Sequence, residues 1–143
     1  MTSRRFEKTL TANDTGESAT HQAGIHIPKS EEELLQFLPF LDPGVKNPDI
    51  WIEFVDETGA EWTFRYVYYN NRLHDEGGTR NEYRLTHTTQ FFRAVGAASG
   101  DVLCLARCSE TNRYLVEVRK AFDYKGVAEP TSPIRLRGWR RAH

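Results

Sequence analysis

One stretch of the chain decides its fold: residues 50–69 have the sequence IWIEFVDETGAEWTFRYVYY. Apolar and polar side chains alternate on both sides of the turn sequence Asp56–Gly59, and this alternation is typical of two antiparallel strands with one buried face. We therefore expect a β-hairpin. The apolar residues that share one side of its strands are Ile50, Ile52, Phe54, Trp62, Phe64, Tyr66 and Tyr68.

Short strands are also expected on both sides of this hairpin. A first strand begins near Lys8, and a short alternating run lies at residues 25–27. Two apolar runs, at residues 102–108 and 114–119, are joined by a polar turn, which predicts a further pair of strands.

Two short helices are expected between these strands. Ser30 and Glu33 form a capping-box signature, and Pro39 limits the helix that follows to about two turns. Residues 88–95 have the pattern of a second short helix. Many short strands with two short helices predict an α+β fold that resembles a β-barrel.

The composition is that of one globular domain. The chain has 143 residues, of which 38% are hydrophobic and 27% are charged, enough for one core but not for two. No apolar run reaches the roughly 18 residues of a membrane span, and no secretory signal is present, so we expect a cytoplasmic protein. Cys104 and Cys108 are expected to be free thiols.

We expect the domain to occupy residues 1–125 and a basic, irregular tail to occupy residues 126–143. The tail contains four arginines, Arg135, Arg137, Arg140 and Arg141.

The net charge of −1 conceals a strong separation of charge along the chain. Residues 31–61 contain nine acidic residues and one basic residue, a net charge of −8, so the rest of the chain carries +7. A near-neutral total is therefore compatible with a polyanionic partner that meets a local basic face. The alternative is that mixed charges only solvate the surface.

The sequence contains no clear catalytic or metal-binding motif. A metal-dependent nuclease of the restriction type needs an acidic residue after proline and then an acid-x-lysine strand. Pro48-Asp49 meets the first condition, but Glu117-Val118-Arg119 places arginine where lysine belongs. We therefore expect no catalytic residue, no metal ligand and no cofactor, and a protein that is not an enzyme.

Two polar segments about fifty residues apart carry the side chains that contact nucleic acids. The first covers residues 11–29 and the second covers residues 68–84. Arginine can donate two hydrogen bonds to guanine, glutamate can accept one from the cytosine amino group, and asparagine can pair with adenine. The alternatives are an exposed, salt-bridged strand around Arg80 and ordinary turn chemistry at Asn13-Asp14.

The same segments resemble the N-terminal effector-binding domain of the EcoRII restriction endonuclease family, a DNA-binding pseudobarrel related to plant transcription-factor domains. In the first segment the resemblance is carried by Leu10–Gly16, by His21-Gln22-Ala23-Gly24 and by Ile27-Pro28. In the second it is carried by Tyr68–Arg72 and Thr79–Thr86, and it covers roughly residues 8–120 in all.

The resemblance implies a non-catalytic domain that grips the major groove of double-stranded DNA with two arms and reads a short CCWGG-like site, where W is A or T. In the family a nuclease domain follows, so a nuclease domain or subunit outside these residues is an expected partner. The chain departs from the family pattern in a longer, acidic stretch at Leu73–Gly78, and at Gly78, Tyr83 and His26.

On this basis we expect two groups of contact residues. The expected base-reading residues are His21, Gln22, His26, Arg80, Asn81, Glu82 and Arg84. The expected phosphate-binding residues are Lys8, Asn13, Lys29, Tyr69, Asn70, Arg72 and Thr79, with the tail arginines as further candidates.

Two other functions remain open from the sequence. One is a small metal-dependent endonuclease subunit of a restriction system. The other is a binder of single strands or RNA that stacks bases on Trp51, Trp62 and the tyrosines, although alternation places most of these rings in the core.

Overall fold

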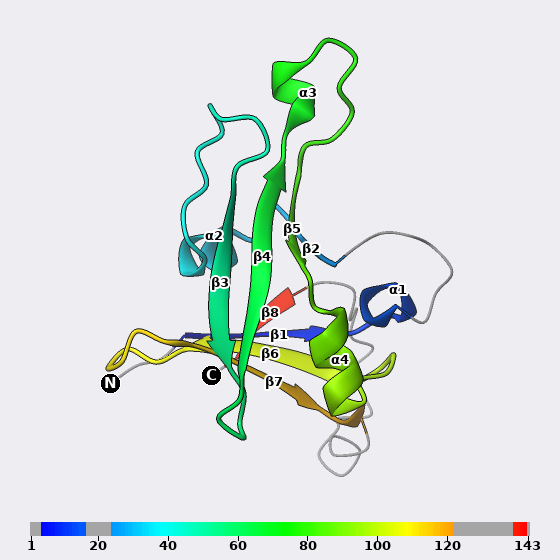
Figure 1. The fold of residues 1–143 in the computed structure, drawn as a ribbon, viewed down its shortest axis with the longest axis vertical. Helices are drawn as coiled ribbons and strands as arrows, with labels where there is room; N and C mark the ends of the chain where they lie inside the picture. The colour runs from blue at the N-terminus through cyan, green and yellow to red at the C-terminus, as the bar shows by residue number, and fades with distance from the viewer. Residues whose placement is uncertain (1–3, 17–23, 122–138, 143) are drawn as a thin grey trace.

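A computed structural model describes residues 4–16, 24–121 and 139–142 (Figure 1). The elements are β1 (Arg4–Thr9), α1 (Ala12–Thr15), β2 (Ile25–Ile27), α2 (Glu32–Phe37), β3 (Asp49–Val55), β4 (Glu61–Tyr69), α3 (Asn71–His74), β5 (Glu82–Thr86), α4 (Thr89–Val95), β6 (Val102–Arg107), β7 (Tyr114–Arg119) and β8 (Trp139–Ala142).

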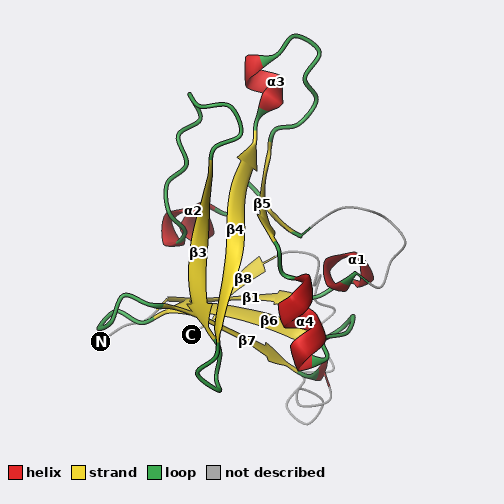
Figure 2. Ribbon diagram, viewed as in Figure 1, coloured by secondary structure: helices red, strands yellow, loops and turns green. Residues whose placement is uncertain are grey.

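The strands form one curled, eight-stranded sheet in the order β2-β5-β4-β3-β7-β6-β1-β8. Each half of this order is antiparallel, and a short parallel pairing of β3 with β7 joins the halves at Phe54–Tyr114 and Val55–Leu115. Figure 2 shows the helices at the margins of the sheet. This half-barrel confirms the expected α+β, barrel-like fold.

The hairpin expected at residues 50–69 is present as β3 and β4. Their register runs without a break from Asp49 opposite Val67 to Val55 opposite Glu61. Asp56 closes the turn, because its carboxylate accepts hydrogen bonds from the Thr58 amide at 2.8 Å, the Ala60 amide at 3.0 Å and the Trp62 indole at 2.9 Å.

The core lies inside the curl of the sheet and is rich in aromatic rings. Phe54 packs on Phe64 at 5.0 Å and on Tyr114 at 5.4 Å between ring centroids. Phe91 of α4 packs on Phe64 at 5.7 Å, and Phe37 of α2 packs edge-on against Tyr114 at 5.3 Å. Aromatic pairs of this kind add to the free energy gained from burial.

The helices differ from expectation at their starts and in number. The expected capping box at Ser30 is wrong, because α2 begins at Glu32 and its N-cap, Glu31, makes no side-chain capping bond. A complete capping box instead lies at α1, where the Thr11 hydroxyl accepts from the Asp14 amide at 3.2 Å and the Asp14 carboxylate accepts from the Thr11 amide at 3.0 Å. The one-turn helices α1 and α3 were not expected.

The end of the expected irregular tail is part of the sheet. Trp139–Ala142 forms β8 and pairs antiparallel with β1. This corrects the expectation for these four residues, whereas residues 122–138, with Arg135 and Arg137, lie outside the described residues.

Cys104 is buried and Cys108 is half-buried, and both are free thiols. None of the described helices is long and apolar enough to cross a membrane.

Candidate nucleic-acid interface

The candidate site lies on the outer face of the half-sheet β2-β5-β4-β3. Cross-strand register places His26 opposite Arg84, Arg84 opposite Val67, and Glu82 opposite Tyr69. Paired residues share a face and successive residues alternate, so these side chains lie on the face opposite the buried Tyr66.

The described parts of two segments lie beside this face. We call residues 10–24 the N-terminal arm and residues 70–81 the C-terminal arm. Figure 1 shows α3 of the C-terminal arm at the outer end of β4 and α1 of the N-terminal arm at the end of β1, with β2 and β5 between them.

A chain of charged groups runs along β5 from the C-terminal arm. One oxygen of the Glu82 carboxylate accepts from the Arg80 guanidinium at 2.6 Å and from the Arg84 guanidinium at 2.9 Å. Burial of Glu82 works to raise its pKa, but the bonds and charges of the two arginines outweigh that effect and lower it. Glu82 is therefore held ionised between two cations.

Arg80 is held from two sides and still reaches solvent. Its guanidinium lies 3.8 Å from the centroid of the Tyr69 ring, in a cation–π contact. Its side chain is 40% exposed, so part of its fork of donors is open to a ligand. Tyr69, expected at a phosphate, supports Arg80 with its ring, and its hydroxyl accepts from Arg65 at 3.4 Å.

Arg84 connects the two arms. It is only 7% exposed, and besides Glu82 it donates to the Gly24 carbonyl at 3.2 Å, at the end of the N-terminal arm. Gly24 has φ +80°, and a Cβ there would lie 2.3 Å from the Leu85 carbonyl oxygen, so the sequence requires glycine at this approach. The geometry favours a positioning role for Arg84 over direct contact with a base.

His26 stands exposed on β2 beside Arg84. Burial and then the charge of Arg84 lower its pKa below the ordinary value of 6.5, which favours the neutral ring at pH 7. A neutral imidazole has one donor and one acceptor nitrogen for a base edge. Its expected companions His21 and Gln22 lie outside the described residues.

Two hydrogen bonds join the two ends of the C-terminal arm. The Arg80 amide donates to the Asn71 side chain at 2.8 Å, and the Arg72 amide donates to the Arg80 carbonyl at 3.0 Å. A Cβ at Gly78 would lie 2.2 Å from the Asn71 carbonyl oxygen, so the close approach at this position requires glycine. Thr79, next to Arg80 in the sequence, is exposed.

The remaining expected contacts divide by exposure. Arg72 and Lys29 are exposed, and Asn13 and Asn81 are half-buried. The Asn81 side-chain oxygen accepts from the Tyr68 hydroxyl at 2.5 Å. Asn81 is thus fixed by the core-facing side of β4.

Two expected phosphate ligands are buried and bound to other residues of the chain. Asn70 is 0% exposed, and its side-chain nitrogen donates to the Val45 carbonyl at 2.9 Å. Lys8 is 6% exposed and bound to Asp14 at 2.6 Å, in an ion pair that is almost fully buried. Both side chains are therefore engaged in contacts within the protein.

The loop at residues 42–48 is a part of the site that the sequence did not indicate. Asn47 and Asn70 exchange two bonds: the Asn47 amide donates to the Asn70 side chain at 2.7 Å, and the Asn70 amide donates to the Asn47 side chain at 3.0 Å. Lys46 pairs with Asp75 at 2.6 Å, and the His74 ring contacts the Pro43 carbonyl at 3.0 Å. The Asn47-Pro48 pair was the available signal, as a turn dipeptide.

The residues considered for nuclease chemistry are bound to arginines. Asp49 accepts from Arg65 at 2.6 Å, and Glu117 accepts from Arg119 at 2.7 Å. Within the described part of the chain, no group of three histidine, cysteine or acidic residues is placed to hold a metal ion. Of the candidate stacking rings, Trp51 is 52% exposed and Tyr66 and Tyr68 are buried.

This architecture, a curled half-barrel with two arms beside one face, is the B3-type pseudobarrel. A solved Arabidopsis FUS3–DNA complex superimposes with a TM-score of 0.59 and 28% identity, over 80% of this chain and 95% of that one. The Arabidopsis thaliana LEC2–DNA complex has the same fold, with a TM-score of 0.59 and 23% identity over 84% of this chain and 96% of that one.

The chain belongs to the family of the N-terminal domain of restriction endonuclease EcoRII, whose model matches residues 2–120. It is also 31% identical over 116 residues to the AP2/ERF and B3 domain-containing transcription repressor TEM1 of Arabidopsis thaliana. That alignment covers 77% of this chain and 29% of the repressor. The resemblance inferred from the two polar segments is thereby confirmed.

Proposed function

We propose that this chain is a sequence-specific, non-catalytic domain that binds double-stranded DNA in the major groove. The observation that carries the proposal is the hydrogen-bonded network of Arg80, Glu82 and Arg84 on an outer face beside the two arms. Two solved structures with this fold are described as DNA complexes, one of them 28% identical to this chain, which supports the proposal.

Each residue of this network has a distinct role in the proposed contact with DNA. Arg80, stacked on Tyr69, donates to a guanine edge, for which the planar guanidinium suits two parallel bonds. Glu82 orients Arg80 and offers its carboxylate to a cytosine amino group. Arg84 stays below the surface, where it holds Glu82 and the end of the N-terminal arm.

The remaining expected contacts complete the proposal. His26 reads a base from β2, His21 and Gln22 read bases from the N-terminal arm, and Asn81 assists from the C-terminal arm. Phosphates are bound by the exposed Lys29, Arg72 and Thr79, with Asn13 at α1.

The expected site is short and CCWGG-like, and the expected setting is a cytoplasmic restriction system. Any cleavage then belongs to a nuclease domain or subunit outside these residues.

Fluorescence anisotropy tests the proposal. A selection on random duplexes first yields a preferred site, and the full chain is then titrated with that duplex, a scrambled duplex and each single strand. We expect the preferred duplex to bind at least tenfold more tightly than the scrambled one, and single strands to bind weakly. Equal binding of all duplexes, or tighter binding of single strands, contradicts the proposal.

Plasmid incubation tests the absence of catalysis. Magnesium or manganese with the full chain should leave supercoiled plasmid intact. If the plasmid is nicked and the nicking is lost in Asp49→Ala or Glu117→Ala, the proposal of a non-catalytic domain is wrong and the chain is a small nuclease.

A further inference from the structure

The sheet has two edges, β2 and β8, and one side chain joins them. The indole Nε1 of Trp139, in β8, donates to the His26 carbonyl of β2 at 3.3 Å. Trp139 is 6% exposed and belongs to the core. The half-barrel is thus closed at this point by a tryptophan and not by strand pairing.

The His26 carbonyl needs such a partner. In an antiparallel pair, alternate residues direct both backbone groups toward the neighbouring strand and the residues between direct theirs away. The His26 carbonyl accepts from Trp139 and therefore points away from β5. The residues of β2 whose backbone groups point toward β5 are then Ile25 and Ile27, opposite Leu85 and Tyr83. The Trp139 bond therefore satisfies a backbone carbonyl that points away from β5, at an expected base-reading residue.

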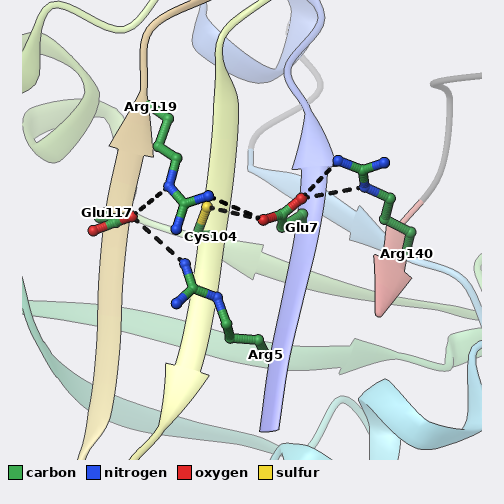
Figure 3. A network of polar contacts seen from close by, with 6 residues as sticks. All are labelled: Arg5, Glu7, Cys104, Glu117, Arg119 and Arg140. Atoms are coloured by element: carbon green, nitrogen blue, oxygen red, sulfur yellow. Dashed lines mark hydrogen bonds and ion pairs between the residues drawn. The ribbon is translucent and has the colours of Figure 1, made fainter. Parts of the chain in front are cut away.

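Strand β8 also contacts β1 through side chains on the outer face of the sheet (Figure 3). Arg140 lies opposite Glu7 and donates to its carboxylate at 2.8 and 3.2 Å. Glu7 is only 5% exposed, and its other oxygen accepts from Arg119 at 3.4 Å. A nearly buried carboxylate between two arginines depends on both for its stability, because an unpaired buried charge is costly.

β1 and β2 are the strands on either side of the N-terminal arm. β1 leads through Leu10 into α1, and β2 follows directly after Gly24. Strand β8 is therefore attached to the two strands that flank this arm, through Arg140 on β1 and through Trp139 on β2.

We propose that β8 braces β1 and β2, the strands before and after the N-terminal arm, and that Trp139 is a positioning residue for His26 in DNA reading. The proposal rests on the proposed function, which it deepens by assigning part of the specificity to residues that do not touch DNA. The brace lies beyond residues 2–120, the part that matches the family model.

A conservative pair of variants in the full chain tests the brace. Trp139→Phe keeps an aromatic ring but removes the indole donor. Trp62→Phe is the matched control, because Trp62 also donates its indole N–H, to Asp56 at 2.9 Å, but at the β3–β4 turn. We expect Trp139→Phe to lower the ratio of preferred to scrambled duplex affinity about three- to tenfold, the effect of one lost hydrogen bond, and Trp62→Phe to leave the ratio unchanged.

Arg140→Gln gives a second variant that does not alter the core. Its side chain is 55% exposed, and we expect a smaller loss of the same ratio than in Trp139→Phe, with a lower melting temperature because Glu7 then keeps only Arg119 of its two arginines. An unchanged ratio in both Trp139→Phe and Arg140→Gln, or an equal fall in Trp62→Phe, overturns the proposal.

Hydrogen exchange separates the brace from the proposed function, because it needs no DNA. We expect faster amide exchange at Ile25 and Ile27 in Trp139→Phe than in the wild type and in Trp62→Phe. Unchanged exchange overturns the brace even where DNA binds. Faster exchange in a protein without duplex preference supports the brace on β2 and contradicts the proposed function alone.

Discussion

Glu82 accepts hydrogen bonds from two arginines through one oxygen, and this arrangement limits what Arg80 can offer to a base. An arginine already paired with a carboxylate is oriented, and its positive charge is partly neutralised. The attraction of Arg80 to phosphates is therefore weaker. Its hydrogen bonds to a base edge that fits its orientation are weakened much less. The carboxylate should therefore favour selectivity over general affinity.

The variant Glu82→Gln tests this division. It keeps the size of the side chain and removes the charge, so we expect tighter binding to scrambled duplexes and a smaller preference for the selected site. Anisotropy titrations of the two duplexes at one salt concentration measure both effects. A uniform gain in affinity for every duplex would remove Glu82 from the reading residues.

Arg80 and Arg72 form a second pair for comparison, one expected at a base and one at a phosphate. Arg80→Ala should cost about 1–3 kcal/mol on the preferred site and relax selectivity at one base pair. Arg72→Ala should weaken all duplexes about equally, because a phosphate contact carries no sequence information. Equal losses on all duplexes for Arg80→Ala would reassign it to the backbone.

The sequence indicated which residue types could contact DNA, but not which of them are exposed. Lys8 and Asn70 have suitable chemistry, yet both are buried, with an ion pair to Asp14 and bonds to the loop at residues 42–48. Their partners are fixed by the tertiary fold, so a motif read in one dimension cannot distinguish a ligand from a support. Exposure at Arg72 was compatible with its expected role, which remains a prediction.

At the scale of elements, the C-terminal arm is supported by the loop at residues 42–48. The Asn70 side chain accepts from the Asn47 amide and donates to two carbonyls, of Val45 and Pro43. Because Asn70 is fully buried, water cannot replace these bonds. The loop therefore fixes the arm at Asn70, the residue that directly follows β4.

Asn70→Ala should lower the free energy of unfolding by about 1–3 kcal/mol, because buried backbone groups lose their partners. It should also weaken the preferred duplex more than the scrambled one, because the arm loses its fixed position. Lys46→Ala is the control from the same loop: its ion pair with Asp75 is exposed, and its loss should cost at most about 1 kcal/mol. Urea denaturation and anisotropy give the two readouts, and an unchanged duplex preference in Asn70→Ala would contradict the positioning role.

The elements that the sequence predicted well are those with a strong local pattern. The β3–β4 hairpin and β7 were predicted from alternation and turns, and β2 and α4 from short runs. The capping box expected at Ser30 was wrong, because α2 begins at Glu32 with Glu31 as its N-cap. A similar short motif at Thr11–Asp14 does form a capping box. Local signatures identify candidates, and tertiary packing selects among them.

At the scale of the whole molecule, charge is distributed unevenly although the total is −1. If four to six phosphates are neutralised, log affinity should fall with log salt at a slope of about −4 to −5. Lys8→Ala should leave this slope unchanged, because Lys8 is held by Asp14, whereas Arg72→Ala should reduce it by about one. Anisotropy titrations over a range of salt concentrations measure the slope, and a slope near zero would contradict phosphate binding.

The pairings that close the sheet were beyond sequence reasoning. The parallel contact of β3 with β7 and the return of β8 to β1 join segments far apart in the chain. Trp139 stands in a basic stretch that lacks the alternation of a longer strand. Such pairings depend on which edges the rest of the fold leaves available.

The bond from Trp139 to His26 connects residues 113 positions apart. Contacts of such separation are slow to form, because the chain entropy lost in closing the loop is offset only after local pairs are in place. We expect Trp139 to reach the core in the last refolding phase, so stopped-flow fluorescence should lose that phase in Trp139→Phe and keep it in Trp62→Phe. During synthesis, β1 and β2 would leave the ribosome well before β8, and the contact between β2 and β8 would form only after Trp139 has been made.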